Sequence, residues 1–281
     1  MGSAMARRFA DAGYDLVLWN RNQAKAESVA GDTGAKVVGS AAAAASDADI
    51  VVTSLADDAA LEAVYLGPDG VVAGIGAGSV AVDTSTVDPQ TVSAVGAALD
   101  ATGAGFLDCP VSGSVSTVEA GALTIMAGGD AQLVDRVTPL LSAISSNIVK
   151  VGGRGAGAST KLAVNGLVHG LNVALSEAVV LAEKAGVDRA AAYEVFQGGA
   201  GGAPFVGYKR EAYVHPEDAE VAFSLDLVAK DMELITSLGR RVGAPMAQAE
   251  TGLDIVKRVI DSGMGDRDLS AIAVYLREVG D

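Results

Sequence analysis

The chain of 281 residues contains a single cysteine, Cys109. No internal disulfide can form, and disulfides are rare in cytosolic proteins, so the cytoplasm is the expected compartment. The two histidines, His169 and His215, have no metal-ligand spacing with any cysteine pair. Structural zinc sites need such spacing, and we therefore expect no metal site.

Basic residues are also scarce. Twenty lysines and arginines stand against 35 aspartates and glutamates, which gives a formal net charge of −15. Nucleic acids and anionic membrane surfaces attract basic faces, so neither is expected as a partner. No stretch approaches the roughly 20 uninterrupted apolar residues of a membrane span. The apolar run after Lys161 is broken by His169, Asn172 and Glu177, and we expect a soluble protein.

What the chain does contain is apolar residues, which make up half of the sequence and suffice for a large core. The length suits two domains. In the first half, short β-rich runs alternate with helical stretches, which predicts a parallel sheet covered on both faces. Strands are expected at 15–19, 36–38, 49–55, 80–83, 105–109, 122–127 and 148–151, and helices at 23–30, 59–65 and 89–101.

The character of the chain changes near the glycine-rich segment 152–157. Beyond it strand signals nearly vanish, and residues 160–184 form one long helical pattern that stops at a glycine, a common helix end. Further helices are expected at 189–196, 225–242, 246–262 and 269–279. The predicted fold is therefore an α/β domain over residues 1–152, followed by an all-helical domain over residues 153–281.

The N-terminal segment runs helix, turn, strand, with no strand before the helix. A dinucleotide-binding fold needs that first strand and its glycine-rich turn, because the turn brings backbone N–H groups close to the pyrophosphate. One glycine of such a turn, Gly2, is present. We expect that Met1 is an internal methionine of a longer polypeptide. The alternative is that Met1 is a true start and that the fold differs.

Asn20 and Arg21 follow the strand expected at 15–19. In dinucleotide-binding domains, an acidic residue at this place binds the ribose 2′-hydroxyl of NAD, whereas a guanidinium can pair with the 2′-phosphate of NADP. Arg21 therefore favours NADP over NAD as the cofactor. The alternative is a solvated surface arginine.

Two short polar segments follow strands. Residues 83–89 lead into a helix, where hydroxyl side chains also suit a simple N-capping turn. Ser112 and Gly113 lie in the segment 108–113. A serine followed by glycine exposes a hydroxyl and backbone N–H groups that can bind a carboxylate, although the pair alone is an ordinary turn.

The long helix opens with small residues before Lys161. Lys161 and Asn165 are four residues apart and share one face of the helix. A solvated lysine is the usual case. The apolar neighbours argue against an exposed face: Leu162, Ala163, Val164 and Leu167.

These segments resemble, in order, motifs of the β-hydroxyacid dehydrogenase family, which includes 3-hydroxyisobutyrate dehydrogenase. The opening is similar to G-x-G-x-M-G-x-x-M-A, cut at its internal methionine, and residues 83–89 are similar to D-x-S-T-x-x-P. Residues 108–129 resemble D-x-P-V-S-G followed by G-x-L-T-I-M-x-G-G. Residues 155–165 resemble G-x-G-x-x-x-K-x-x-x-N, and residues 223–234 resemble F-x-x-x-L-x-x-K-D-x-x-L. Ser114 departs from the pattern, because many relatives have a second glycine there, and this leaves the substrate open.

The resemblance implies a Rossmann-type dinucleotide-binding domain, then a long helix that joins it to the helical domain. It implies reversible hydride transfer between NADP or NAD and a small hydroxy acid or its aldehyde or keto form. Lys161 would be the catalytic proton donor and acceptor, Ser112 and Gly113 would bind the substrate carboxylate, and Asn165 a polar substituent. The residues implied to contact the cofactor are Gly2, Asn20, Arg21, Leu55, Ala56, Thr86 and Lys230.

For Lys230 the alternative is an ion pair with Asp226, one helical turn away. The family commonly forms homodimers or homotetramers. Two alternatives to a dehydrogenase are an imine reductase and a catalytically inactive dinucleotide-binding protein. Imine reductases generally lack a lysine at the position of Lys161, and the pair of Lys161 and Asn165 argues against an inactive protein.

Overall fold

The computed structural model describes residues 1–280 and divides into two compact units, Met1–Lys161 and a unit that begins at Leu162. The strands of the first unit are β1 (Val17–Leu18), β2 (Lys36–Val37), β3 (Ile50–Thr53), β4 (Val80–Asp83), β5 (Gly105–Asp108), β6 (Val111–Ser112), β7 (Leu123–Gly128) and β8 (Ser145–Gly152). Its helices are α1 (Gly2–Asp11), α2 (Gln23–Thr33), α3 (Ala41–Ala45), α4 (Asp58–Leu66), α5 (Val71–Gly74), α6 (Pro89–Asp100), α7 (Val115–Glu119) and α8 (Ala131–Leu141).

The main sheet has the strand order β3-β4-β5-β7-β6, with β8 also paired to β7. β3, β4 and β5 are parallel, whereas β7 runs antiparallel to β5 and β6. The sheet is therefore mixed and not wholly parallel as predicted. The connection from β6 to β7 holds only ten residues (113–122), fewer than a parallel crossover needs. β6 itself has two residues, too few to show a period in the sequence.

β1 and β2 form a separate parallel pair, in which Val17 lies opposite Lys36 and Leu18 opposite Val37. Within residues 1–280 no strand connects β1 to β3, so both are edge strands. This agrees with the sequence, which shows no strand signal before α1.

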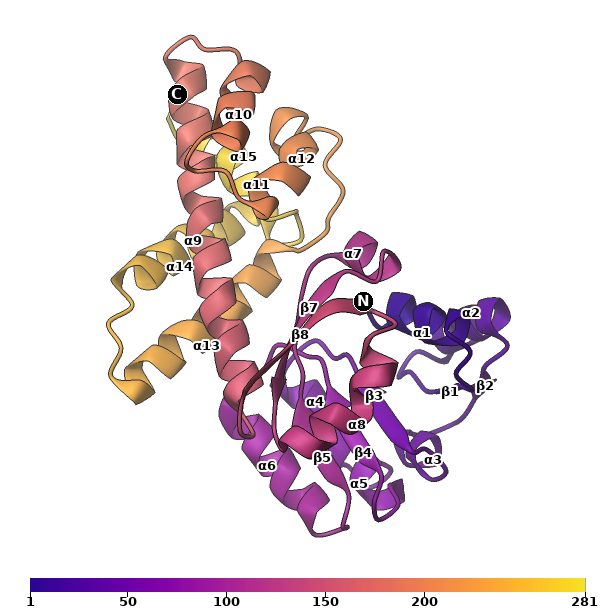
Figure 1. Cartoon of the computed structure of the whole chain (residues 1–281). Helices are drawn as coiled ribbons and strands as arrows, with labels where there is room; N and C mark the ends of the chain where they lie inside the picture. The colour runs from indigo at the N-terminus through magenta and orange to yellow at the C-terminus, as the bar shows by residue number, and fades with distance from the viewer. Residues whose placement is uncertain (281) are drawn as a thin grey trace. The chain divides into compact units, whose positions relative to one another are not determined.

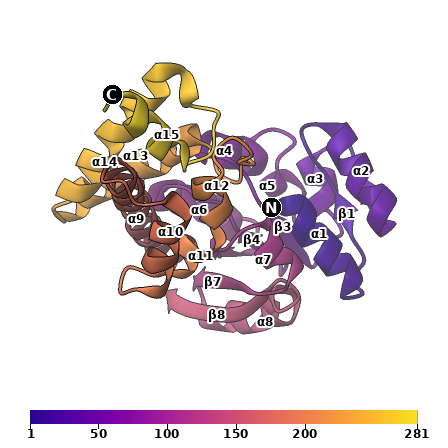
Figure 2. The same cartoon turned by 90° about the horizontal axis from the view of Figure 1, so that it is seen from above.

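Helices cover both faces of the main sheet. Successive side chains of β4 point to opposite faces, and the first three are apolar, so each face needs a covering layer. Val80 and Val82 share one face and pack in a core with residues of α1, α7 and α8. Ala81 points the other way, into a core built from α3, α4, α5 and α6. All of β4 is buried, which fits a central strand covered on both sides. The first unit is a three-layer α/β/α domain, most of whose elements are labelled in Figures 1 and 2.

The second unit is helical. The long helix α9 (Ala156–Lys184) begins in the first unit and runs through the second. It is followed by α10 (Arg189–Gly198), α11 (Pro204–Tyr208), α12 (Arg210–Val214), α13 (Leu225–Val242), α14 (Ala247–Val259), a π-helical turn over Ile260–Met264 and α15 (Ala271–Glu278). One large apolar cluster with members from α9 to α15 forms its core.

The polar residues of α9 are part of this core. Asn172 donates a hydrogen bond to the Leu269 carbonyl and accepts one from Tyr213, which also contacts Ser176. By length and composition alone α9 could cross a membrane, contrary to the expectation from the sequence. Such helices also occur in the cores of soluble proteins, and buried polar residues bonded within the unit fit a core helix.

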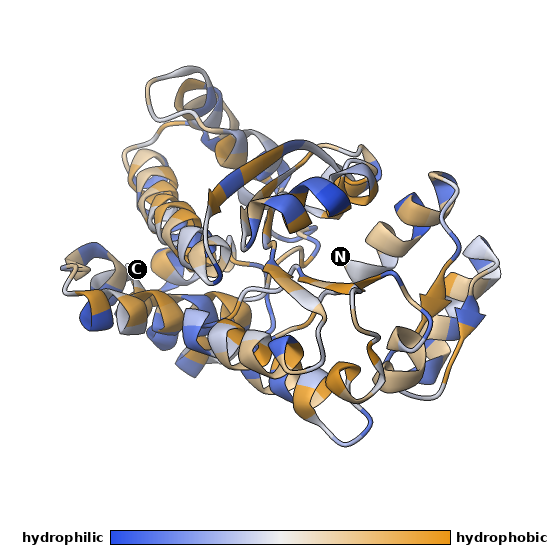
Figure 3. Cartoon of the chain, turned by 60° about the horizontal axis from the view of Figure 1, so that its bottom comes forward, coloured by the Kyte–Doolittle hydropathy of each residue, from blue (hydrophilic) through white to orange (hydrophobic). Residues whose placement is uncertain are grey.

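One prediction about α9 was wrong. Leu167 was expected to help bury the helix face near Lys161, but its side chain is 74% exposed, and Leu181 is 73% exposed. Figure 3 shows hydrophobic and hydrophilic residues alternating along the helices of this unit. Leu167 and Leu181 are 14 residues apart, about four turns, and so lie on the same side of α9.

Candidate functional site

The carboxyl ends of β3, β4 and β5 carry a buried polar cluster. Thr53, Asp83 and Asp108 are register partners in adjacent parallel strands. Asp83 Oδ1 accepts hydrogen bonds of 2.7 Å from the hydroxyls of both Thr53 and Ser85. Thr53 also contacts the buried Tyr65 hydroxyl at 2.9 Å. Carboxyl ends of parallel strands are where ligands bind in open α/β sheets.

This cluster holds the loops that contain three of the predicted cofactor residues. The backbone N–H of Leu55 donates to the Ser85 hydroxyl at 2.8 Å, next to Ala56 in one loop and Thr86 in the other. Helix α6 is capped by Asp88 and not by a hydroxyl of the preceding segment. The segment 83–89 therefore does form an N-capping turn, but with a carboxylate as the cap, and a role of Thr86 at the cofactor stays a prediction.

Asp83 had no role in the sequence analysis. Its signals there were its place at the end of an apolar strand and at the start of the segment that resembles D-x-S-T-x-x-P. Burial raises the pKa of Asp83 to about 6, although the hydrogen bonds from Ser85 and Thr53 oppose this. Cys109 lies next to it, and its backbone N–H donates to the Asp83 carbonyl at 2.7 Å.

Asp83→Asn is expected to remove a pH dependence from the stability of the first unit. Because the folded pKa of about 6 lies above the ordinary 3.8, folding is favoured by the protonated form. This contribution is complete below about pH 4 and is lost as the pH rises through about 6, a change of about 3 kcal/mol. Asparagine can keep both hydroxyl hydrogen bonds, since both go to one oxygen.

The measurement is urea unfolding of the two proteins at a series of pH values across this window. The free energy of unfolding of the wild type relative to the variant should fall as the pH rises. A difference that stays constant would show that Asp83 does not titrate in this way.

Gly2, Asn20 and Arg21 are the predicted cofactor residues in the N-terminal segment of the first unit. A Cβ at Gly2 would be 3.4 Å from Ser54 Cβ, so the start of α1 adjoins the end of β3. Asn20 and Arg21 lie in the exposed turn between β1 and α2, where Asn20 Oδ1 accepts a hydrogen bond from the Asn22 N–H. Asn20 and Arg21 therefore follow β1, and Gly2 lies beside the end of β3 and not after a strand of its own. Their contacts with a cofactor stay predictions.

Ser112 ends β6, opposite Thr124 of β7. Gly113 has φ +140°, and a Cβ there would lie 2.7 Å from a Leu123 methyl and 2.9 Å from Thr117, so glycine is required. Ser114, which departs from the family pattern, caps α7 in a reciprocal capping box with Thr117. Its side chain therefore has a structural role in this chain.

Lys161 and Asn165 lie on α9, whose start is attached to β5. The buried Asp108 carboxylate accepts 2.9 Å hydrogen bonds from the backbone N–H groups of Gly155 and Ala158. Burial raises the pKa of Asp108, and these N–H groups oppose the rise. Asp108 had no assigned role in the sequence analysis, because its partners are 47 and 50 residues away.

In the second unit Asn165 belongs to a second buried cluster, on α9 and α13. Its amide donates to Asp231 Oδ2 at 2.6 Å, and the Lys230 ammonium lies 2.9 Å from Asp231 Oδ1. His169 Nε2 lies 3.6 Å from Asp231 Oδ2, too far for a hydrogen bond, and its ring stacks on Phe223. The structure thus brings together two predicted residues, Asn165 and Lys230, through an aspartate that the sequence analysis did not assign.

Burial alone would raise the pKa of Asp231, but neighbouring His169 and the Lys230 ammonium hold it below its ordinary value. Asp231 is therefore an anion that orients an amide and an ammonium group. The expected alternative for Lys230 was a pair with Asp226, whereas the close carboxylate is that of Asp231.

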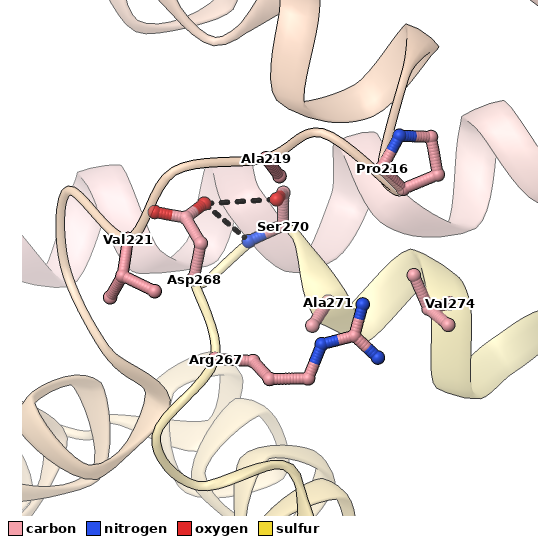
Figure 4. A pocket seen from close by; sticks show the side chains of 8 residues that line it. All are labelled: Pro216, Ala219, Val221, Arg267, Asp268, Ser270, Ala271 and Val274. Atoms are coloured by element: carbon pink, nitrogen blue, oxygen red, sulfur yellow. Dashed lines mark hydrogen bonds between the residues drawn. The ribbon is translucent and has the colours of Figure 1, made fainter.

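A small surface pocket of the second unit contains none of the predicted site residues. In Figure 4 Asp268 accepts hydrogen bonds from the Ser270 side chain and backbone at its edge. Lys209 forms a buried ion pair with the same carboxylate. The pocket is lined by Pro216, Ala219, Val221, Arg267, Asp268, Ser270, Ala271 and Val274.

Two family models match the chain. The model described as the NAD binding domain of 6-phosphogluconate dehydrogenase matches residues 1–153. The model described as NAD-binding of NADP-dependent 3-hydroxyisobutyrate dehydrogenase matches residues 155–276. Together they cover nearly all of both units.

Individual relatives agree with these models. The chain is 32% identical to glyoxylate/succinic semialdehyde reductase 2 of Arabidopsis thaliana, over 99% of this chain and 77% of the relative. It is 32% identical to 2-(hydroxymethyl)glutarate dehydrogenase of Eubacterium barkeri, over 97% and 90%. The solved 3-hydroxyisobutyrate dehydrogenase from Salmonella typhimurium is 26% identical with a TM-score of 0.89, over 98% of this chain and 95% of that one. An imine reductase from Pseudomonas sp. shares the fold, with a TM-score of 0.65 and 21% identity, over 97% and 94%.

Proposed function

Because the chain belongs to the β-hydroxyacid dehydrogenase family and is an NAD(P)-dependent oxidoreductase of CH–OH groups, we propose that it uses NADP to interconvert a small 3-hydroxy acid and its semialdehyde. A related 2-hydroxy acid and its 2-oxo form are the other members of this substrate class. The substrates named for the two relatives support this class, since both names describe small acids with a carbonyl or hydroxyl group.

The residues of the first unit fit a dinucleotide. The start of α1 adjoins the end of β3, and backbone N–H groups at such a helix start suit a pyrophosphate. Leu55, Ala56 and Thr86 would border the nicotinamide and its ribose, and Arg21 the adenosine ribose. Lys230, held by Asp231, is assigned to the cofactor as well. When bound, the nicotinamide supplies or accepts the hydride.

The protein's own part in the chemistry is binding and proton transfer. Ser112 and the backbone at Gly113 would bind the substrate carboxylate, and Asn165 a polar substituent. Lys161 would donate a hydrogen bond to the reacting oxygen, stabilise the negative charge that develops there and deliver the proton. In the oxidative direction its neutral amine would take the hydroxyl proton.

The observation that carries this proposal is the combination of Lys161 and Asn165 on one helix, α9, whose first turn and whose Asn165 side chain are each held by a buried aspartate. Asp108 holds the first turn of α9, and Asp231 orients the Asn165 amide. Lys161 also argues against an imine reductase, with which the chain shares the fold.

The test is a screen of semialdehydes, glyoxylate and 3-hydroxy acids with NADP(H) and NAD(H), followed by the absorbance of the reduced nicotinamide. We expect turnover with at least one short carboxylate substrate. Turnover of cyclic imines without turnover of carbonyl compounds would favour an imine reductase. Dinucleotide binding without turnover of any compound would favour an inactive binding protein.

Arg21→Ala is expected to weaken NADP binding by roughly 1.5–3 kcal/mol, the range of a charge-assisted hydrogen bond, and to leave NAD binding nearly unchanged. The reason is that the guanidinium would pair with the 2′-phosphate, which NAD lacks. Titration of both cofactors into both proteins measures this. An equal loss for both cofactors would show that Arg21 acts on the turn and not on the phosphate.

We further infer a cytoplasmic homodimer or homotetramer. Leu167 and Leu181, exposed on the same side of α9, support association. Exposed apolar side chains that gather on one surface commonly mark contacts between proteins. The buried, unpaired Cys109 fits a reducing compartment.

A further inference from the structure

The start of α9 has no capping side chain of its own. Gly155, directly before the first helical residue, has φ +85° and carries no side chain that could accept a hydrogen bond. The first N–H groups of a helix have no partner within the helix and need an acceptor. Asp108 supplies it from the end of β5: Oδ1 accepts the Gly155 N–H and Oδ2 the Ala158 N–H, each at 2.9 Å.

This arrangement satisfies the same N–H groups as a capping box, but with one side chain, Asp108, that belongs to another element. In a capping box, two side chains of the helix satisfy the N–H groups of the cap residue and of the third helical residue. Here Gly155 and Ala158 occupy those two positions, and a single carboxylate serves both. Two bonds from one planar group fix the rotation of the first turn as well as its height above the sheet.

The backbone of the first turn also approaches the sheet closely. A Cβ at Gly157 would lie 2.6 Å from the Met126 carbonyl oxygen and closer still to that of Asp108. A Cβ at Gly128 would lie 2.6 Å from Gly157 N and 2.7 Å from Asp108 Oδ1. The turn therefore lies against β5 and β7 with no room for a side chain at position 157 or 128, and a shift of Asp108 would disturb these contacts.

Asp108 thereby connects two parts of the proposed site. Lys161 follows Ala158 by three residues, less than one helical turn, and Ser112 follows Asp108 by four residues. We propose that Asp108 is a positioning residue for hydride transfer, which sets the place of Lys161 relative to the Ser112 segment through its two hydrogen bonds to α9. This inference rests on the proposed role of Lys161.

Asp108→Asn tests the inference with almost no change in shape. An asparagine offers one acceptor oxygen and one amino group, so in either orientation the Gly155 or the Ala158 N–H faces a donor. We expect single-turnover hydride transfer to slow by about 10- to 100-fold, because a small misplacement of a catalytic group has that effect. Dinucleotide affinity should change by less than about twofold, and the amides of Gly155 and Ala158 should exchange hydrogen faster.

Two comparisons distinguish positioning from a general loss of stability. Val137→Ala removes buried volume from α8 in the same unit and should destabilise it while hydride transfer stays normal. In a Lys161→Ala background, Asp108→Asn should cause no further slowing, since residues that act through one group are not additive.

Near-normal transfer in Asp108→Asn, or a full additional loss in the Lys161→Ala background, would overturn the positioning role while leaving Lys161 in place. Near-normal transfer in Lys161→Ala itself would overturn the proposed role of Lys161, and the positioning role of Asp108 with it. If Asp108→Asn and Val137→Ala lower the free energy of unfolding equally and also slow hydride transfer equally, Asp108 is only a structural cap.

Discussion

Replacing Lys161 with alanine is expected to slow hydride transfer by about 10²- to 10⁴-fold, the usual contribution of a general acid–base group. A carbonyl that accepts hydride develops negative charge on its oxygen, and an ammonium group both stabilises that charge and provides the proton. Cofactor affinity should barely change, because this side chain is assigned to the substrate oxygen and not to the dinucleotide.

Lys161→Arg is the matched control, because it keeps the positive charge. We expect it to be nearly as slow as the alanine variant, since a guanidinium does not give up its proton at workable pH. Single-turnover hydride transfer and an NADPH titration on all three proteins measure the two effects separately. Full activity in Lys161→Arg would mean that charge alone is needed and that the proton comes from elsewhere.

Replacing Asp268 with alanine is expected to destabilise the second unit by about 3–5 kcal/mol, the range for removing one partner of a buried ion pair. Asp268 accepts 2.7 and 2.8 Å hydrogen bonds from the Lys209 ammonium and also binds the N–H groups of Ala222 and Phe223. Both charged side chains are buried. The variant would leave the Lys209 ammonium without its partner and free the loop before α13.

The pH dependence gives a second test of this ion pair. Burial would raise the pKa of Asp268, but Lys209 and Ser270 hold it below its ordinary value. The stabilisation is therefore present above the ordinary pKa and lost as the pH falls through the folded one. Urea unfolding should show that the variant loses less stability on acidification than the wild type does.

The exposed pair of Lys257 and Glu233, 2.8 Å apart in the same unit, is the control. Glu233→Ala should change the free energy of unfolding by no more than about 1 kcal/mol, because solvent screens exposed pairs. If Asp268→Ala costs no more than this control, the buried pair contributes little net stability.

Several elements were predictable because their signals are local. β4 and α13 have the bounds that the sequence indicates, since each is framed by clear apolar and capping patterns. α8 (Ala131–Leu141) was missed, and its internal Pro139 disguises a helix that begins at the capping Asp130. The antiparallel course of β7 was missed as well, because pairing direction depends on partners that the strand itself does not encode.

The residues of the candidate site also fall into two groups, those with a local signal in the sequence and those whose partners are distant. Lys161, Asn165 and Ser112 lie in motifs that can be recognised along the chain. The aspartates that support the site, Asp83 and Asp108, could not be assigned roles. Their partners lie about 30 and 50 residues away, and only folding brings them together. Leu167 shows the opposite error, because an apolar residue near Lys161 in the sequence was assumed to face inward.

The position of Cys109 gives the protein an intrinsic reporter. Its thiol is fully buried, and burial, together with the nearby Asp108 and Asp83 carboxylates, raises its pKa far above the ordinary value. Only the thiolate reacts with alkylating reagents, so modification requires that the first unit opens. The second unit has no cysteine. The rate of thiol labelling therefore follows the opening of the dinucleotide-binding unit alone, in a chain whose total unfolding signal combines both units.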